Sequence, residues 1–250
     1  MTSRKVVGVF LHSAVHQPHI NTLTAMTHGI RETTDDLVFL SNSTKYMDCD
    51  VAIIFGSWKD RYTKHHILKN EIVNSHKGDL LVIETPLLGR TITEDHRYYR
   101  VGKGHYMDSL GYFNNKNSDK DRWGIIRTDV GLEIKDWRKE GKHIMFLMQL
   151  PGDAATADVD ILKWLQDEIV KCKKISDRPV RVRMHPLISS YDLSKFEEFV
   201  EKQKDVSMVF GHKNPIAMDL EDCWATVSFT SGGSVDSLLA GVPVITPSPL

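Results

Sequence analysis

The residues best suited to chemistry lie near the end of the chain, in a turn of small hydroxyl residues and glycines, Thr230-Ser231-Gly232-Gly233. A predicted strand precedes this turn and a short predicted helix follows it. Backbone N–H groups and the positive end of a helix dipole favour an anion at such a position. The turn therefore predicts a phosphate-binding site. Asp236, one turn into the helix, either accepts hydrogen bonds from ribose hydroxyls or only complements the helix dipole.

Two further segments follow predicted strands of the same half of the chain. His185 precedes Pro186, and a proline keeps the backbone of the preceding residue extended. Its imidazole either donates a hydrogen bond to a phosphate or caps a loop. The loop Gln149-Leu150-Pro151-Gly152-Asp153 has a glycine where Rossmann folds hold phosphate. It is not G-x-G-x-x-G, so the sequence indicates no hydride-transfer cofactor.

A reaction in which a hydroxyl group attacks needs a general base that takes the proton from that hydroxyl. Glu84 directly follows a predicted strand in the first half and is one candidate. It is otherwise a solvated carboxylate at a strand end or a partner of Arg90. His12, just past the first predicted strand, is the rival candidate. The sequence does not separate Glu84 from His12.

An aromatic and basic segment of the first half predicts a surface that binds sugars or nucleic acid, since stacking and phosphate contacts use these residue types. A solvated loop is the alternative. The candidate residues of this surface are Arg90, Arg97, Tyr98, Tyr99 and His105.

Histidines raise the question of a metal site, because His12, His16 and His19 form H-x3-H-x2-H and His65-His66 lie further on. No Asp, Glu or Cys completes a recognised ligand spacing. We therefore expect no metal.

These residues must be positioned by strands and helices that alternate along the chain. In the first half, apolar runs predict strands at 6–11, 37–40, 51–55 and 80–83, with helices at 21–31 and 61–75. Residues 86–123 are poor in aliphatic side chains and predict a long irregular loop. In the second half, strands are predicted at 144–148, 180–184, 206–210, 225–228 and 242–245, with a helix at 158–172.

The alternation predicts an α/β fold with two Rossmann-like domains that face a central cleft. We expect one domain at 1–123, which includes the irregular loop 86–123, and a second domain at 124–250. In such sheets ligands bind beyond the carboxyl ends of the strands.

The chain resembles the metal-independent GT-B glycosyltransferases, particularly the Kdo-type capsule transferases and related bacteriophage sugar transferases. The resemblance implies that His185 contacts the nucleotide phosphate and aids departure of the leaving group. It also implies that Thr230, Ser231 and Gly232 hold phosphate. By the same resemblance, residues 124–250 form a donor-binding domain and residues 1–123 an acceptor-side domain, in which the aromatic and basic segment contacts the acceptor. The segments that carry the resemblance are Gln149 to Asp153, His185-Pro186, Thr230 to Pro243 and, more loosely, Ile83 to Arg90.

The chain departs from this family in two respects. Paired glutamates found in many retaining GT-B enzymes are missing from the predicted helix that carries Asp236, which favours an inverting reaction. The sequence also stops at Leu250, directly after the last predicted strand, whereas GT-B proteins commonly continue into C-terminal helices. Either the chain is cut short or the fold is minimal.

Composition limits the function further. The chain has 250 residues, 41% hydrophobic and 26% charged, which excludes a disordered or collagen-like chain. Its net charge of -1 provides no overall attraction to nucleic acid. Three cysteines without a C-x-x-C favour a reducing compartment. No apolar run reaches the roughly 20 residues of a membrane span, so we expect a cytoplasmic protein, in the host cytoplasm if it is of phage origin.

We therefore expect a glycosyltransferase that moves a sugar from a UDP- or CMP-sugar, or a similar nucleotide sugar, to an acceptor hydroxyl. The reaction is expected to be inverting and to need neither a metal nor another cofactor. The acceptor is either a glycan or a hydroxymethylated base of phage DNA. A nucleotide-sugar epimerase of the same fold and a non-catalytic nucleotide-sugar binding protein are the alternatives. The sequence leaves the oligomeric state open.

Overall fold

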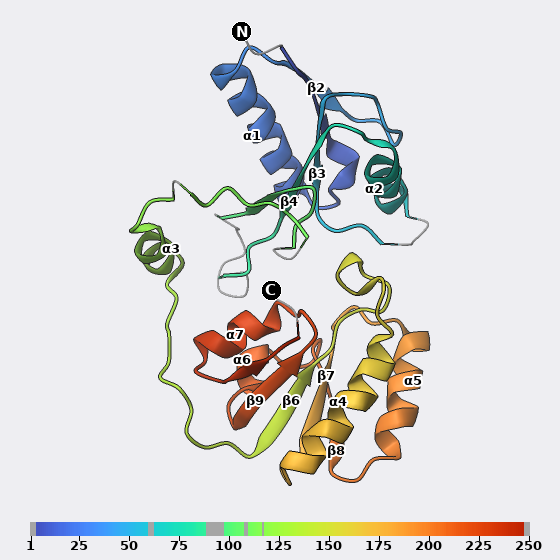
Figure 1. The fold of residues 1–250 in the computed structure, drawn as a ribbon, viewed down its shortest axis with the longest axis vertical. Helices are drawn as coiled ribbons and strands as arrows, with labels where there is room; N and C mark the ends of the chain where they lie inside the picture. The colour runs from blue at the N-terminus through green and yellow to red at the C-terminus, as the bar shows by residue number, and fades with distance from the viewer. Residues whose placement is uncertain (1–3, 60–62, 89–97, 108–109, 117, 248–250) are drawn as a thin grey trace. The chain divides into compact units, whose positions relative to one another are not determined.

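The computed structural model describes residues 4–59, 63–88, 98–107, 110–116 and 118–247. The chain divides into two compact units, Met1–Arg122 (unit 1) and Trp123–Leu250 (unit 2). Each unit contains one five-stranded sheet with helices on its faces (Figure 1). The predicted α/β class with two Rossmann-like sheets is confirmed. The acceptor and donor roles of residues 1–123 and 124–250 stay predictions.

Unit 1 has the strand order β2-β1-β3-β4-β5, in which the first four strands are parallel and β5 is antiparallel. Helices α1 and α2 lie on opposite sides of the sheet (Figure 1). All four strands predicted for this half are present. The elements are β1 (Val6–Phe10), the 3-10 helix η1 (Leu11–Ser13), α1 (Gln17–Thr33), β2 (Leu37–Ser41), β3 (Val51–Phe55), α2 (Lys64–Ser75), β4 (Asp79–Glu84) and β5 (Arg100–Lys103).

Strand β5 corrects the prediction that residues 86–123 are irregular throughout. It pairs with β4 from Leu81↔Lys103 to Glu84↔Arg100 and so extends the sheet at one edge. A side chain at Gly102 would meet the carbonyl oxygen of His105, so this strand needs glycine there. The strand is short and has only one aliphatic side chain, Val101, which is why no apolar pattern predicts it.

The core of unit 1 follows from the alternation of side chains along parallel strands. Val7 and Val9 of β1 pack with Ile53 of β3 and with Leu23 of α1. Three of these four side chains are completely buried, and Val7 is nearly so. Both faces of the sheet are covered by helices, which is typical of parallel sheets and explains the continuous apolar runs.

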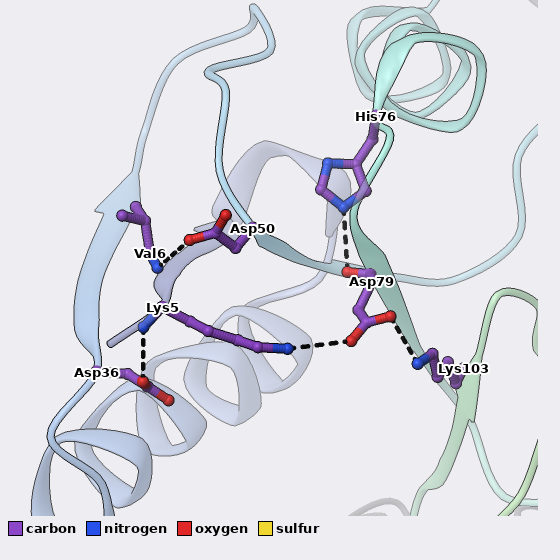
Figure 2. A network of polar contacts seen from close by, with 7 residues as sticks. All are labelled: Lys5, Val6, Asp36, Asp50, His76, Asp79 and Lys103. Atoms are coloured by element: carbon purple, nitrogen blue, oxygen red, sulfur yellow. Dashed lines mark hydrogen bonds and ion pairs between the residues drawn. The ribbon is translucent and has the colours of Figure 1, made fainter. Parts of the chain in front are cut away.

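Carboxylates close the amino-terminal edge of the same sheet (Figure 2). Asp79 Oδ1 lies 2.6 Å from Lys103 Nζ, and Asp79 Oδ2 lies 3.4 Å from Lys5 Nζ. Asp36 Oδ1 accepts a 2.9 Å hydrogen bond from the Lys5 N–H. The hydrogen bond from Lys103 lowers the pKa of Asp79. These contacts join β1, β4 and β5 at the edge opposite to the carboxyl ends of the parallel strands.

Unit 2 has the strand order β10-β9-β6-β7-β8, and every strand pair is parallel. Figure 1 shows α4 and α5 on one side of this sheet and α6 and α7 on the other. The predicted strands are present, although β10 is shorter than expected. The elements are α3 (Arg122–Val130), β6 (His143–Leu147), the 3-10 helix η2 (Ala154–Thr156), α4 (Ile161–Ile175), β7 (Val180–Met184), α5 (Ser190–Glu201), β8 (Val206–Phe210), α6 (Ile216–Asp219), β9 (Cys223–Ser228), α7 (Gly233–Leu239) and β10 (Val244–Ile245).

Central strand β6 is buried on both faces. Ile144 and Phe146 pack with Leu165 of α4. Met145 and Leu147 face the opposite way and pack with residues near α6 and β10. The alternation therefore supplies two separate cores, one on each side of the sheet.

Residues 135–142, which we call the strap, run across the amino-terminal edge of this sheet. The N–H of Lys135 donates to the Leu239 carbonyl at 2.9 Å, and the N–H of Arg138 donates to the Gly241 carbonyl at 2.8 Å. The Arg138 guanidinium donates to carbonyls of the loop before β9, including that of Leu220 at 2.7 Å. The strap is therefore part of unit 2 rather than a loose connection.

His143, the first residue of β6, is a buried polar group of unit 2. Its side chain is 2% exposed, and neither ring nitrogen has a hydrogen-bond partner among the residues that the structure describes. Burial is the largest cause that lowers the pKa of His143, to about 4. The ring is therefore neutral in the folded protein at neutral pH.

This burial predicts a loss of stability in mild acid. Between pH 6.5 and pH 4 the unfolded chain binds a proton at His143 and the folded chain does not, so stability falls as pH falls through that range. His143→Leu is expected to have a shallower decline in unfolding free energy, measured by urea titration at pH 7, 6 and 5. His28→Leu, at an exposed position of α1, is the control and is expected to keep the wild-type slope. Equal slopes for His143→Leu and the wild type would contradict this account.

Candidate functional site

The strand order of unit 2 determines where a ligand fits. From central β6 the chain moves outward to β7 and β8, and then returns to place β9 and β10 on the other side of β6. The order reverses between β6 and β9, and ligands of such sheets bind at the reversal, beyond the carboxyl ends of the strands. Two predicted segments follow these strands: the Gln149 loop after β6 and the Thr230 turn after β9.

A direct hydrogen bond joins these two segments. The Oε1 atom of Gln149 accepts from the backbone N–H of Thr230 at 2.8 Å. The two residues are far apart in sequence, and the parallel pairing of β6 with β9 brings them together. The structure thus places the two predicted phosphate-binding segments side by side.

Internal hydrogen bonds shape the turn from Thr230 to Gly233. The Gly233 N–H donates to Ser231 Oγ at 3.3 Å, and the Ser234 N–H donates to the Ser231 carbonyl at 3.0 Å. Ser228 Oγ and Ser234 Oγ are 2.7 Å apart beneath the turn. The N–H groups of Ser231 and Gly232 donate to no residue that the structure describes. Two backbone donors are thus available to an anion.

His185 follows β7, next to β6 in the sheet, and is half-buried. Its Nδ1 accepts a hydrogen bond from the Leu187 N–H at 3.1 Å. A neutral ring with Nδ1 as acceptor carries its proton on Nε2. Nε2 is therefore the atom that has the predicted role of hydrogen-bond donor.

The remaining donor-side candidates lie in the loop after β6. Gly152 has a φ of +69°, a conformation that favours glycine. Thr156 Oγ1 donates to the Leu150 carbonyl at 2.9 Å and so closes the loop that carries Asp153. The loop is held in a defined turn beside Gln149.

Arg183, at the same edge of the sheet, is not among the site residues predicted from the sequence. It lies near the end of β7, forms an ion pair with Asp219 of α6 and donates to the Asn214 carbonyl at 2.8 Å. Burial lowers the pKa of Arg183, and the nearby carboxylate of Asp236 opposes that shift. The signal in the sequence is the alternation Val-Arg-Val-Arg-Met, because it puts a charged side chain on a covered face of a strand.

In unit 1 the strand order reverses between β1 and β3. Ser13 Oγ lies at this point, where it accepts from the Phe55 N–H at 2.8 Å and donates to the Phe10 carbonyl at 2.6 Å. His12 precedes Ser13 within η1 and is half-buried. The structure thus places His12 at the reversal point of the first sheet.

Glu84, the other candidate base, lies at the end of β4. Its Oε1 accepts from both the N–H and the hydroxyl of Thr85, at 2.7 and 2.8 Å. Its Oε2 accepts from the N–H of Ser57 at 3.2 Å. The carboxylate therefore holds together the segments that follow β3 and β4, whatever other role it has.

The acceptor-side candidates are only partly within the described residues, because Arg90 and Arg97 lie outside them. Tyr99 packs edge-on against Phe55, with ring centroids 5.8 Å apart. His105 is 9% exposed, and burial lowers its pKa. Its Nδ1 accepts from the Met107 N–H at 3.0 Å. The predicted surface therefore includes a largely buried histidine, His105, and a half-buried tyrosine, Tyr98.

The histidines considered as metal ligands make contacts with other rings. His19 stacks on Phe55 with ring centroids 4.0 Å apart, and His16 lies edge-on to His19 at 5.5 Å. Within the described part of the chain, no three His, Cys, Asp or Glu side chains form a group suited to a metal ion. The expectation of a metal-free site stays a prediction.

Among the residues that the structure describes, no helix has the length and apolar character needed to span a membrane.

Comparison with known proteins supports the fold. KpsC of Thermosulfurimonas dismutans, a beta Kdo 2,4 transferase, is similar to this chain with a TM-score of 0.54 and 11% identity, over 98% of this chain and 80% of that one. This likeness over both units confirms the GT-B type of fold.

A UDP-GlcNAc 2-epimerase of Methanocaldococcus jannaschii, in complex with UDP-GlcNAc and UDP, matches with a TM-score of 0.35 and 11% identity, over 96% of this chain and 83% of that one. At that TM-score it supports no inference. No protein-family model matches the chain, and no curated protein matches it.

The Gln149 contact gives a prediction for the Thr230 amide. Gln149→Leu removes the acceptor, a loss of about 1 kcal/mol, so exchange of the Thr230 amide proton is expected to become about fivefold faster. Hydrogen exchange followed by NMR measures this rate. Gln149→Glu keeps an acceptor oxygen and is expected to stay close to the wild type, as is the control Gln203→Leu in a distant loop. Unchanged exchange in Gln149→Leu would show that the contact does not order the turn.

Proposed function

We propose that the protein is a glycosyltransferase that uses a nucleotide sugar, and that unit 2 binds this donor. The observation that carries the proposal is the hydrogen bond from the Thr230 N–H to Gln149 Oε1, which brings both phosphate-binding candidates to the reversal point of the sheet. The fold likeness to a beta Kdo transferase, and the His185-Pro186 motif beside this edge, support it.

The proposed reaction is a direct displacement with inversion. The acceptor oxygen forms a bond to the anomeric carbon while the bond from that carbon to the phosphate oxygen breaks. The nucleotide leaves with the electron pair, and the acceptor proton goes to a base. His185 Nε2 and the N–H groups of Ser231 and Gly232 are proposed to stabilise the charge that develops on the leaving phosphate, without a metal ion.

The proposed base comes from unit 1, and His12 is the stronger of the two candidates. Glu84 already accepts three hydrogen bonds, so its replacement is expected to disturb the loops after β3 and β4. His12→Ala, in contrast, is expected to lower kcat while nucleotide binding stays unchanged. The acceptor is proposed to be either a glycan or a hydroxymethylated DNA base.

Thermal-shift measurements with CMP, UDP, GDP and their sugar conjugates test the proposal. A ligand that binds only the folded state raises the melting temperature. One nucleotide class is expected to raise it, equally in EDTA, and the shift is expected to shrink in His185→Ala. His212→Ala, in a loop of the same unit, is the control. If none of these nucleotides raises the melting temperature, the proposal that the protein uses a nucleotide sugar is wrong.

Product analysis separates transfer from the alternative activities. With the donor alone, a transferase leaves the sugar configuration unchanged, whereas an epimerase converts the donor to its epimer. With glycan or hydroxymethylated DNA acceptors present, we expect release of free nucleotide. Donor binding without turnover on either acceptor would favour a non-catalytic binding protein.

A further inference from the structure

The charges at the carboxyl edge of sheet β10-β9-β6-β7-β8 have an arrangement that the proposed function leaves unexplained. Asp219 is 5% exposed and Asp236 lies in the first turn of α7, directly after the Thr230 turn. Two carboxylates beside a phosphate site repel the ligand, because like charges at short range cost free energy, most of all where water is excluded.

Arg183 is the cation set against these carboxylates. Its side chain is 11% exposed and forms an ion pair with Asp219. Its Nη2 donates to the Asn214 carbonyl at 2.8 Å, which fixes the direction of the guanidinium. Asp236 acts on it from a second helix. One side chain at the end of β7 therefore joins α6 to the loop after β8, and the charge of Asp236 on α7 also favours its charged form.

The strand places this group close to the candidate ligand contacts. Arg183 precedes His185 by two residues and pairs in the sheet with Leu147, two residues before Gln149. Side chains alternate along β7, so Arg183 lies on the face opposite to Val182 and Met184, which belong to the core beneath α4 and α5. It thus lies on the face of the sheet that α6 and α7 cover.

We propose that Arg183 is a positioning residue that neutralises Asp219 and Asp236, and thereby makes the β6–β9 edge able to accept a phosphate group. This inference rests on the proposed function. It adds a reason why the proposed site in unit 2 accepts a negatively charged phosphate group. It predicts that Arg183 contributes to recognition of the phosphate part of a nucleotide and not to recognition of its nucleoside part.

The experiment compares each of CMP, UDP and GDP with its own nucleoside. Nucleotide Kd values come from isothermal titration calorimetry, and nucleoside binding comes from saturation-transfer NMR. Arg183→Met leaves Asp219 buried without its partner and is expected to lower the melting temperature. The double variant Arg183→Met/Asp219→Leu removes both charges and is expected to fold as stably as the wild type. In Arg183→Met, measured below its melting temperature, we expect nucleotide binding to weaken about tenfold or more, with nucleoside binding unchanged. In the double variant, which has the same net charge at this site as the wild type, we expect most of the nucleotide affinity to return.

Two further variants sharpen the comparison. Arg183→Lys keeps the positive charge and is expected to recover part of the lost affinity. Arg181→Met removes an exposed arginine two residues earlier on the same strand and is expected to bind as the wild type does.

Wild-type nucleotide affinity in Arg183→Met would overturn the inference, because the pair would then serve the fold alone. Equal losses for nucleotide and nucleoside would also overturn it, since the whole site would then be distorted. If the wild type binds no nucleotide, the proposed function itself fails, and this inference fails with it.

Discussion

Parallel pairing of β6 with β9 is the constraint on which the rest of unit 2 depends. It requires the chain to complete two outward crossovers, through α4 and α5, before it returns to the other side of β6. The return brings residues about eighty positions apart to one edge, where Gln149 accepts from the Thr230 N–H. The helices, the covered faces and the candidate site all follow from that order of strands, since crossovers between parallel strands need helix-length connections.

The two edges of each sheet serve different purposes. At the amino-terminal edges, polar groups close the fold: Asp79 joins strands in unit 1, and Arg138 binds carbonyls in unit 2. At the carboxyl edges, side chains such as Ser13 and Gln149 hold loops in place through hydrogen bonds. Residues of the candidate sites lie next to these side chains in the same loops. This division is expected of parallel α/β sheets, in which stability and ligand binding lie at opposite ends.

The strands were predictable because parallel strands buried on both faces leave long apolar runs, as in Val51–Phe55. Strand β5 was not predictable, since its pairing with β4 depends on backbone hydrogen bonds and on Gly102 rather than on apolar side chains. The segments of the candidate site could be selected from their residue types and strand-end positions. The contact between Gln149 and Thr230 could not be predicted, because nothing in the residues near Gln149 specifies that its side chain reaches Thr230. Arg183 was overlooked for a related reason: its partners Asp219 and Asp236 become neighbours only through the fold.

The strap gives unit 2 a definite starting point as an exchangeable module. The strap precedes β6, which is the first strand of the sheet in the sequence. It forms hydrogen bonds to Leu239, Leu220 and Gly241. A side chain at Gly241 would meet the Asp136 carbonyl, so the strap and the end of α7 fit together as one surface. A chimera that joins this unit to a foreign partner must therefore cross over before Lys135. A junction placed at β6 itself would leave carbonyls before β9 without donors and cut the module inside its own fold.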